Sequence, residues 1–179
     1  YQNRRKLSGV AAYAKAHAWN LQTVVCPPSE EEMDQLIELW QPAGIIVNAG
    51  TTPGETFCGN GRRVPTLYFH DPDRHQNCIA CDSNAIARHA ARELLSLGRV
   101  TYAYLPWEHA AIWSDVRRDT FAALLAAHGK TSATIDLAAG NASPSVLVRR
   151  IASGLKTLPR PIGLFAANDR MAALAVSAC

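Results

Sequence analysis

The chain has 179 residues, of which 48% are apolar, 18% charged and 7% aromatic, the composition of an ordinary globular protein rather than a disordered or fibrous one. Its 18 Lys and Arg against 15 Asp and Glu leave a net charge of +3, too weak to suggest nucleic acid or an acidic membrane as the partner of this segment. No run approaches the roughly 20 apolar residues of a membrane-spanning helix, and polar residues 1–5 do not begin a signal peptide. We therefore expect a soluble, cytoplasmic protein.

The cysteines are odd in number and scattered, which argues against the disulfide framework of a small secreted domain. They are Cys26, Cys58, Cys78, Cys81 and Cys179. Cys78 and Cys81 form a C-x-x-C pair, for which redox chemistry or half of a zinc site with His70 and His75 are alternatives. Both cysteines fall on a predicted strand, where residues three apart point to opposite faces. A structural role is therefore favoured.

In the first half of the chain, apolar spacing and turn residues predict two helices and four short strands. Ser29 with Glu32 three residues later has the pattern of a capping box at the start of the second helix. The predicted helices cover 4–17 and 30–40, and the predicted strands cover 19–25, 44–49, 64–69 and 76–81.

The second half alternates helices and strands regularly. Asp82 or Ser83 caps the first helix, Gly98 and Gly129 end helices as C-terminal glycines do, and Ser143 caps another. The predicted helices cover 83–97, 112–128, 144–155 and 169 onward, and the predicted strands cover 100–105, 134–137 and 162–166.

This alternation predicts an α/β fold with helices on both faces of largely parallel sheets. No strand precedes the first helix, although a doubly wound sheet has its central first strand there. The sequence stops at Cys179 inside a predicted helix with no cap. We therefore expect this chain to be a fragment, or the ordered part, of a longer protein.

The motifs for catalysis are weak. The Gly-rich loop 50–63 follows a strand but has neither G-x-G-x-x-G leading into a helix nor the GK[ST] ending of a P-loop, so a surface loop is favoured. No G-x-S-x-G nucleophile elbow is present. His109 lies near a strand-to-helix loop, but no partner for it is evident. We expect no catalytic residue, no metal and no cofactor.

Polar side chains gather where the predicted strands end, which is where open α/β sheets bind small ligands. They are Asp82, Trp113, Arg117, Asn168 and Asp169. Carboxylate, amide and guanidinium groups pair with hydroxyl and ring oxygens, and an indole stacks on a sugar. Each residue also has a plain structural alternative as a helix cap, a surface ion pair or a core residue. Their shared position favours a neutral, polyhydroxylated ligand.

The chain resembles the periplasmic-binding-protein-like sensor domain of lactose-repressor-type transcription regulators, especially the xylose operon regulator branch. The resemblance runs in order along nearly the whole chain. It is carried by 4–10 (RRKLSGV) with 13–14 (YA), 81–84 (CDSN), 94–98 (LLSLG), the W-x-x-x-R-x-x-x-F pattern at Trp113, Arg117 and Phe121, 158–163 (LPRPIG) and 167–172 (ANDRMA).

The resemblance implies two lobes, 1–80 without its first strand and 82–179 without its last elements, with the sugar held between them. It assigns Arg117, Asp82, Asn168 and Asp169 to the ligand. It also suggests first-lobe contacts from Gln2 and Asn3, just before the first helix. The family implies a homodimer whose DNA-binding domain, C-terminal in the xylose branch, lies outside this chain and responds allosterically to the sugar.

Two other hypotheses stay open. A periplasmic sugar-binding protein of a transport system shares the same architecture, because fold does not settle function. A small doubly wound enzyme acting on a sugar would use the strand-end carboxylates Asp82 and Asp169.

Overall fold

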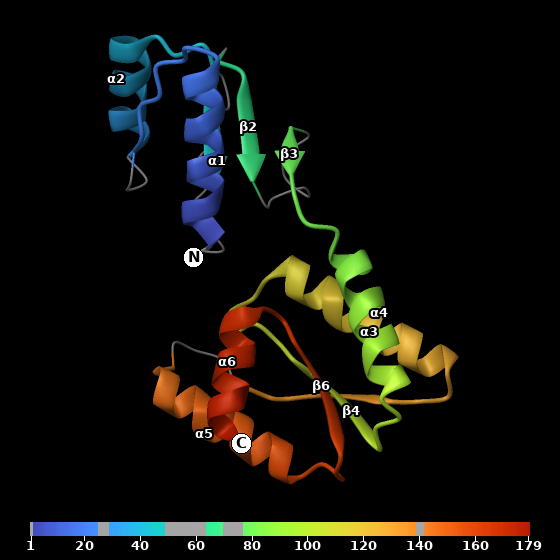
Figure 1. The fold of residues 1–179 in the computed structure, drawn as a ribbon. Coiled ribbons are helices and arrows are strands. Elements are labelled where there is room, and N and C mark those ends of the chain that lie inside the picture. The colour runs from blue at the N-terminus through green and yellow to red at the C-terminus, as the bar shows by residue number, and fades with distance from the viewer. Residues whose placement is uncertain (1, 25–28, 49–63, 70–76, 139–141) are drawn as a thin grey trace. The chain divides into compact units, whose positions relative to one another are not determined.

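The computed structural model describes residues 2–24, 29–48, 64–69, 77–138 and 142–179. The chain divides into two compact units, Tyr1–Ala80 and Cys81–Cys179, which are coloured blue to green and green to red in Figure 1. Among the described residues, no helix is long and apolar enough to cross a membrane.

The first unit contains two helices and a small parallel sheet. The helices are α1 (Gln2–Ala16) and α2 (Glu30–Trp40), and the strands are β1 (Ile45–Asn48), β2 (Thr66–Phe69) and β3 (Cys78–Ile79). The strand order is β1-β2-β3, with Ile45 opposite Thr66 and Tyr68 opposite Cys78. The Gly-rich loop 50–63 and the two histidines His70 and His75 lie outside the described residues.

Helix α2 begins with the predicted capping box. The Ser29 hydroxyl accepts from the Glu32 N–H at 3.2 Å, and the Ser29 N–H donates to Glu32 Oε2 at 2.7 Å. These hydrogen bonds from Ser29 lower the pKa of the Glu32 carboxyl. The prediction at this helix start is therefore confirmed to the residue.

The predicted strand over 19–25 is wrong for its described residues, 19–24, which form no strand. Helix α1 ends in a turn at Ala18, whose φ is 54°, and the Trp19 N–H donates to the Ala14 carbonyl at 2.8 Å. The Trp19 ring then packs edge-on against Tyr13 with the ring centroids 5.3 Å apart. These contacts hold Trp19 against its own helix, whereas Leu21 and Val24 stay exposed and pair with no strand in the described part of the chain.

The second unit has a three-stranded parallel sheet between two pairs of helices (Figure 1). Its helices are α3 (Ser83–Ser96), α4 (Ile112–Ala127), α5 (Pro144–Lys156) and α6 (Asp169–Ala178), and its strands are β4 (Thr101–Leu105), β5 (Ser132–Thr134) and β6 (Ile162–Ala166). The strand order is β5-β4-β6. The predicted α/β class with parallel sheets is confirmed.

The central strand β4 is buried on both faces, which explains its unbroken apolar sequence. Tyr102 and Tyr104 point into a cluster with residues of α3 and α4, whereas Ala103 and Leu105 point into a cluster with residues of α5 and α6. The first cluster is completed by Ala87, Ala91, Phe121, Leu125 and Ala167, and the second by Ile135, Leu137, Leu147, Ile151, Leu155, Met171 and Ala175.

The predicted helix-ending glycines are confirmed. Gly98 and Gly129 have φ values of 57° and 67°, the left-handed conformation that glycine adopts without a steric cost. Ser143 is the N-cap residue of α5, as predicted, but its hydroxyl lies 3.1 Å from the Ser145 hydroxyl and makes no cap hydrogen bond. Pro144 at the first helical position supplies a preset φ instead.

Strand β5 begins and ends earlier than the predicted 134–137. Its pairing with β4 places Ser132 opposite Tyr102 and Thr134 opposite Tyr104. After Thr134 only one further ladder bond forms, from Ile135 N–H to the Tyr104 carbonyl at 2.9 Å. The chain then turns at Ala138, where φ is 52° and the N–H donates to Asp136.

A core substitution tests this packing. Ile151 is fully buried under β4, so Ile151→Ala should lower the free energy of unfolding by about 2–5 kcal/mol. Val176 on α6 is 78% exposed, and Val176→Ala should change it by no more than about 0.5 kcal/mol. Equal effects of the two variants in chemical denaturation would contradict the assignment of the core.

Candidate ligand-binding site

The carboxyl ends of β4 and β6 lie side by side in the second unit. Leu105 and Ala166 are paired, and the Ala167 N–H donates to the Leu105 carbonyl at 2.8 Å. The loop 106–111 follows β4, and the two residues after β6 lead into α6. The two segments that carry most of the predicted site residues therefore begin at the same edge of the sheet.

Arg117 reaches this edge from α4. Its Nη1 donates to the Ala167 carbonyl at 2.5 Å, and its guanidinium carbon lies 4.8 Å from the centre of the Trp113 ring. Its Nε is buried and has no hydrogen-bond partner among the described residues. Burial lowers the pKa of Arg117, opposed by smaller contributions from Tyr104 and Cys81. The site thus holds a half-buried cation with an N–H still to be satisfied.

Trp113, in the first turn of α4, joins Arg117 to the loop after β4. Its ring packs at the edge of the α3–α4 cluster, and its centroid is 6.1 Å from that of Trp107. Trp113 is therefore partly the core residue that the sequence allowed as an alternative, and its stacking on a sugar stays a prediction.

Asn168 and Asp169 begin α6. The Asn168 side-chain oxygen accepts from the Met171 N–H at 3.0 Å, so Asn168 is the N-cap. Its amide nitrogen is the group that it can offer to a ligand. Asp169 is exposed in the first helical turn, where the helix dipole favours a carboxylate.

Asp82 caps α3, the structural alternative that the sequence allowed. One carboxylate oxygen accepts from the Ala85 N–H at 2.8 Å, and the other lies 3.8 Å from Arg88. Cys81 precedes it outside β3, so the argument that the C-x-x-C pair lies on one strand is wrong. Cys78 is half-buried and Cys81 is exposed. No contact given by the structure joins the Asp82 carboxylate to Arg117, Asn168 or Asp169.

Asn3 lies within the first turn of α1 rather than before it, because the helix begins at Gln2. The prediction that Gln2 and Asn3 precede the first helix is therefore wrong. Their side chains lie outside the described part of the structure, so their contribution to a ligand stays a prediction.

Sequence reasoning missed an ion pair beside this site. Glu108, in the loop after β4, has a side chain only 6% exposed, and its carboxylate forms an ion pair with Arg170 on α6, with 2.7 Å between the nearest oxygen and nitrogen atoms. The same carboxylate oxygen lies 3.8 Å from His109, so the expectation that His109 has no partner is wrong. Trp107 and Glu108 directly follow Pro106 at the end of β4, and the strand-end rule that selected Asp169 would have found them.

Trp107 lies between these groups. The Arg170 guanidinium carbon is 5.5 Å from the centre of its ring, and the His109 ring is edge-on at 5.7 Å. The backbone N–H of Trp107 donates to the Ser114 hydroxyl at 3.1 Å, and this hydroxyl lies 3.0 Å from the Tyr104 hydroxyl. Burial raises the pKa of Tyr104, which keeps this buried network in its neutral form.

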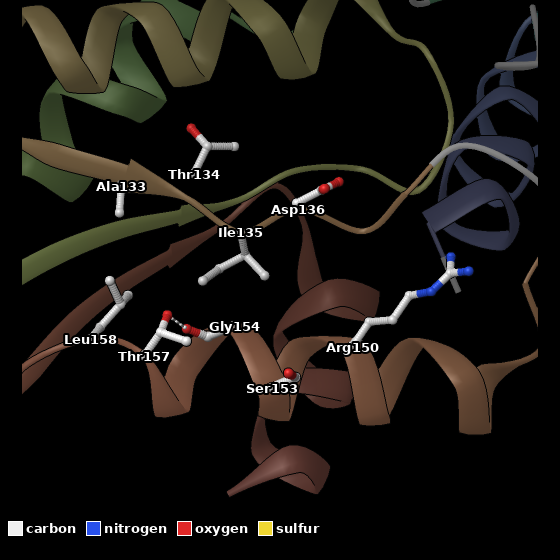
Figure 2. Close-up of a pocket in the computed structure, with 9 residues that line it drawn as sticks. All are labelled: Ala133, Thr134, Ile135, Asp136, Arg150, Ser153, Gly154, Thr157 and Leu158. Carbon is white, nitrogen blue, oxygen red and sulfur yellow. Dashed lines mark hydrogen bonds between the residues drawn. The ribbon is translucent and has the colours of Figure 1, made fainter.

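A pocket of about 380 Å³ lies elsewhere, between β5 and α5. Figure 2 shows Asp136 and Arg150 at one end of it and Thr157 and Leu158 at the other. The Asp136 carboxylate already accepts from Ala138, and Arg150 donates to the Leu137 carbonyl. None of the predicted site residues lines this pocket, and its charged groups are engaged, so the carboxyl ends of β4 and β6 remain the better candidate.

The fold is similar to that of solved LacI-family transcriptional regulators. A sugar-binding regulator from Escherichia coli, whose structure contains phosphate, matches 96% of this chain with a TM-score of 0.67 and 18% identity. A regulator from Corynebacterium glutamicum matches 96% at 0.70 and 19%, and one from a Rhodococcus species matches 96% at 0.70 and 20%. No family model and no curated sequence matches the chain.

The chain spans 64%, 62% and 65% of these three structures, respectively. It therefore corresponds to less than two thirds of each, and at these identities the similarity establishes the fold alone.

The ion pair at this edge gives a stability test. Glu108→Gln removes the charge that pairs with Arg170 and should lower the free energy of unfolding by roughly 1–3 kcal/mol, because this half-buried pair lies between exposed pairs, worth up to about 1 kcal/mol, and buried pairs, whose loss costs about 3–5 kcal/mol. The control is Asp119→Asn, which removes an exposed partner of Arg118 and should cost no more than about 1 kcal/mol. An unchanged midpoint of urea unfolding for Glu108→Gln would show that the ion pair does not hold the loop.

Proposed function

We propose that this chain is the sugar-sensing effector domain of a transcription regulator. The observation that carries the proposal is Arg117, a half-buried cation with one unpaired N–H, which packs on Trp113 and bonds the Ala167 carbonyl where two parallel strands end. The similarity in fold to regulators that include a sugar-binding one supports it.

The chemistry of the site favours a neutral monosaccharide, and the resemblance to the xylose operon regulator branch suggests one of the xylose type. Arg117 donates to ring or hydroxyl oxygens, the exposed Asp169 carboxylate accepts from hydroxyls, and the Asn168 amide can donate. One guanidinium and one carboxylate balance each other, so a ligand without charge satisfies the site. The Trp113 ring, with Arg117 over it, gives an apolar surface beside these polar groups.

Regulation follows from the expected two-lobed arrangement. We propose that the sugar binds between the lobes 1–80 and 82–179 and favours one of their arrangements. A ligand shifts such an equilibrium only by its difference in affinity for the two states, with a coupling of typically about 1–3 kcal/mol. A DNA-binding domain elsewhere in a cytoplasmic homodimer would read this change.

We infer no catalytic activity. The Glu108 carboxylate beside His109 is held by Arg170 at 2.7 Å, so it is not free to act as the base or orienting group of a catalytic histidine.

A thermal-shift screen of the whole protein against aldopentoses, aldohexoses and their phosphates tests the proposal. A sugar present at 100 times its Kd should stabilise the protein by about 2.7 kcal/mol. Arg117→Ala should abolish this shift while the ligand-free protein stays folded. Arg118→Ala is the matched control, because Arg118 pairs with the exposed carboxylates of Asp115 and Asp119. A full response of the Arg117 variant would refute the site, and a well-folded protein that no sugar stabilises would refute the function.

Asp82 can be tested for both of its roles separately. Asp82→Ala loses the α3 cap and should cost about 0.5–2 kcal/mol of stability, whereas Asp82→Asn keeps a good cap residue. If Asp82 also binds the sugar, Asp82→Asn should raise the Kd for the sugar and leave the Tm unchanged. Equal Kd values for Asp82→Asn and the wild type, measured by calorimetry, would leave Asp82 as a cap only.

A further inference from the structure

Trp107 carries the second unpaired donor of this region. Its indole Nε1 is buried and has no hydrogen-bond partner among the described residues, like Arg117 Nε. Buried polar groups are nearly always paired, and a buried donor left unsatisfied is costly. Two such donors in one neighbourhood indicate that an acceptor is required there.

Both donors belong to residues that contact Trp113. The Arg117 guanidinium carbon is 4.8 Å from the centre of the Trp113 ring on α4, and the Trp107 ring centroid is 6.1 Å from it. Trp107 follows β4, and Arg117 bonds the carbonyl of Ala167, which follows β6. The residues that carry the two unpaired N–H groups therefore both contact Trp113, at the strand ends where the sugar is proposed to bind.

The Trp107 ring is fixed by its surroundings. Its backbone N–H is bound to Ser114, and the Arg170 guanidinium lies over the ring while it pairs with the nearly buried Glu108 carboxylate. A donor held in this way is preorganised, and binding then costs less side-chain entropy. Glu108 and Arg170 are thus positioning residues for the indole.

We propose that the indole N–H of Trp107 donates a hydrogen bond to one oxygen of the bound sugar and makes the site specific for a sugar that has that oxygen. This inference rests on the proposed function and adds to it a residue that selects among sugars. A site built to pair with a hydroxyl rejects the deoxy analogue, because the donor is then left unpaired.

The N–H has no exposed surface in this structure, so the sugar oxygen reaches it through a rearrangement of the side chains that cover it. Its NMR signal should therefore respond strongly to binding. Trp107 is one of four tryptophans in the chain, which makes the indole signals simple to assign with single Trp→Phe variants.

The experiment titrates the whole protein, labelled with ¹⁵N at its tryptophan indoles, with D-xylose, L-arabinose, D-ribose and D-glucose. For the sugar that binds, the Trp107 indole proton should move downfield and saturate with the Kd measured by calorimetry. Trp107→Phe should raise this Kd roughly three- to tenfold, the range expected for the loss of one hydrogen bond. Trp40→Phe, at a 41% exposed position on α2, should not.

Deoxy analogues of the binding sugar separate a hydrogen bond from loss of ring packing. For the one analogue that lacks the partner oxygen, Trp107→Phe should cause little further loss, whereas for the other analogues it should cause the full loss. A uniform loss for every analogue would contradict the proposal and leave Trp107 as a packing residue.

The remaining outcomes distinguish the two proposals. A sugar that binds with dependence on Arg117 but leaves the Trp107 indole signal and the Kd of Trp107→Phe unchanged overturns the role of Trp107 alone. A water molecule would then be the partner of the N–H. If none of the four sugars binds a folded protein, the role of Trp107 as a sugar donor and the proposed function fail together.

Discussion

The hydrogen bond from the Arg117 guanidinium to the Ala167 carbonyl is the interaction on which the candidate site depends. It joins α4 to the segment between β6 and α6, and the Ala167 N–H is itself bound to Leu105 at the end of β4. One side chain thus ties together the helix that carries Trp113, the central strand and the start of α6. Arg117 is also only partly satisfied by the protein, so the group that organises the site is the group that can receive a ligand.

The packing of β4 holds the residues of the candidate site in place. Strand β4 is buried between two apolar clusters, with tyrosines on one face and smaller aliphatic residues on the other. The Tyr104 hydroxyl extends to the first turn of α4 and donates to the Ser114 carbonyl at 2.8 Å. Ser114 in turn accepts from the backbone of Trp107. These hydrogen bonds connect the buried Tyr104 to Trp107 and to the first turn of α4, which carries Trp113. They join neutral groups, so salt has little effect on them.

Local signals in the sequence predicted much of the fold. The capping box at Ser29 and Glu32, the cap at Asp82 and the helix-ending glycines Gly98 and Gly129 depend on neighbours within a few residues, and all are found. The strand predicted over 19–25 is wrong for residues 19–24 because a strand needs a partner, and Trp19, the first residue of this segment, packs instead on Tyr13 of α1. The predicted bounds of β5 are wrong because the register of β5 with β4 decides where the strand begins and ends.

The candidate site was predictable only in part for the same reason. Arg117, Asn168 and Asp169 follow from the rule that ligands bind at strand ends, and the structure brings Arg117 and Asn168 to the same edge. The pairing of Glu108 with Arg170 joins the loop after β4 to the first turn of α6, which is far away in the sequence. No spacing pattern reveals such a pair, and its burial becomes visible only when the sheet has brought the two segments together.

A crystal structure of the whole protein with D-xylose or the sugar that replaces it would test the central claim most directly. The account predicts sugar oxygens within hydrogen-bond distance of the Arg117 guanidinium at the carboxyl ends of β4 and β6. A sugar bound elsewhere, for example between β5 and α5 against Asp136 and Arg150 in the pocket of Figure 2, with Arg117 free of contact, would contradict it.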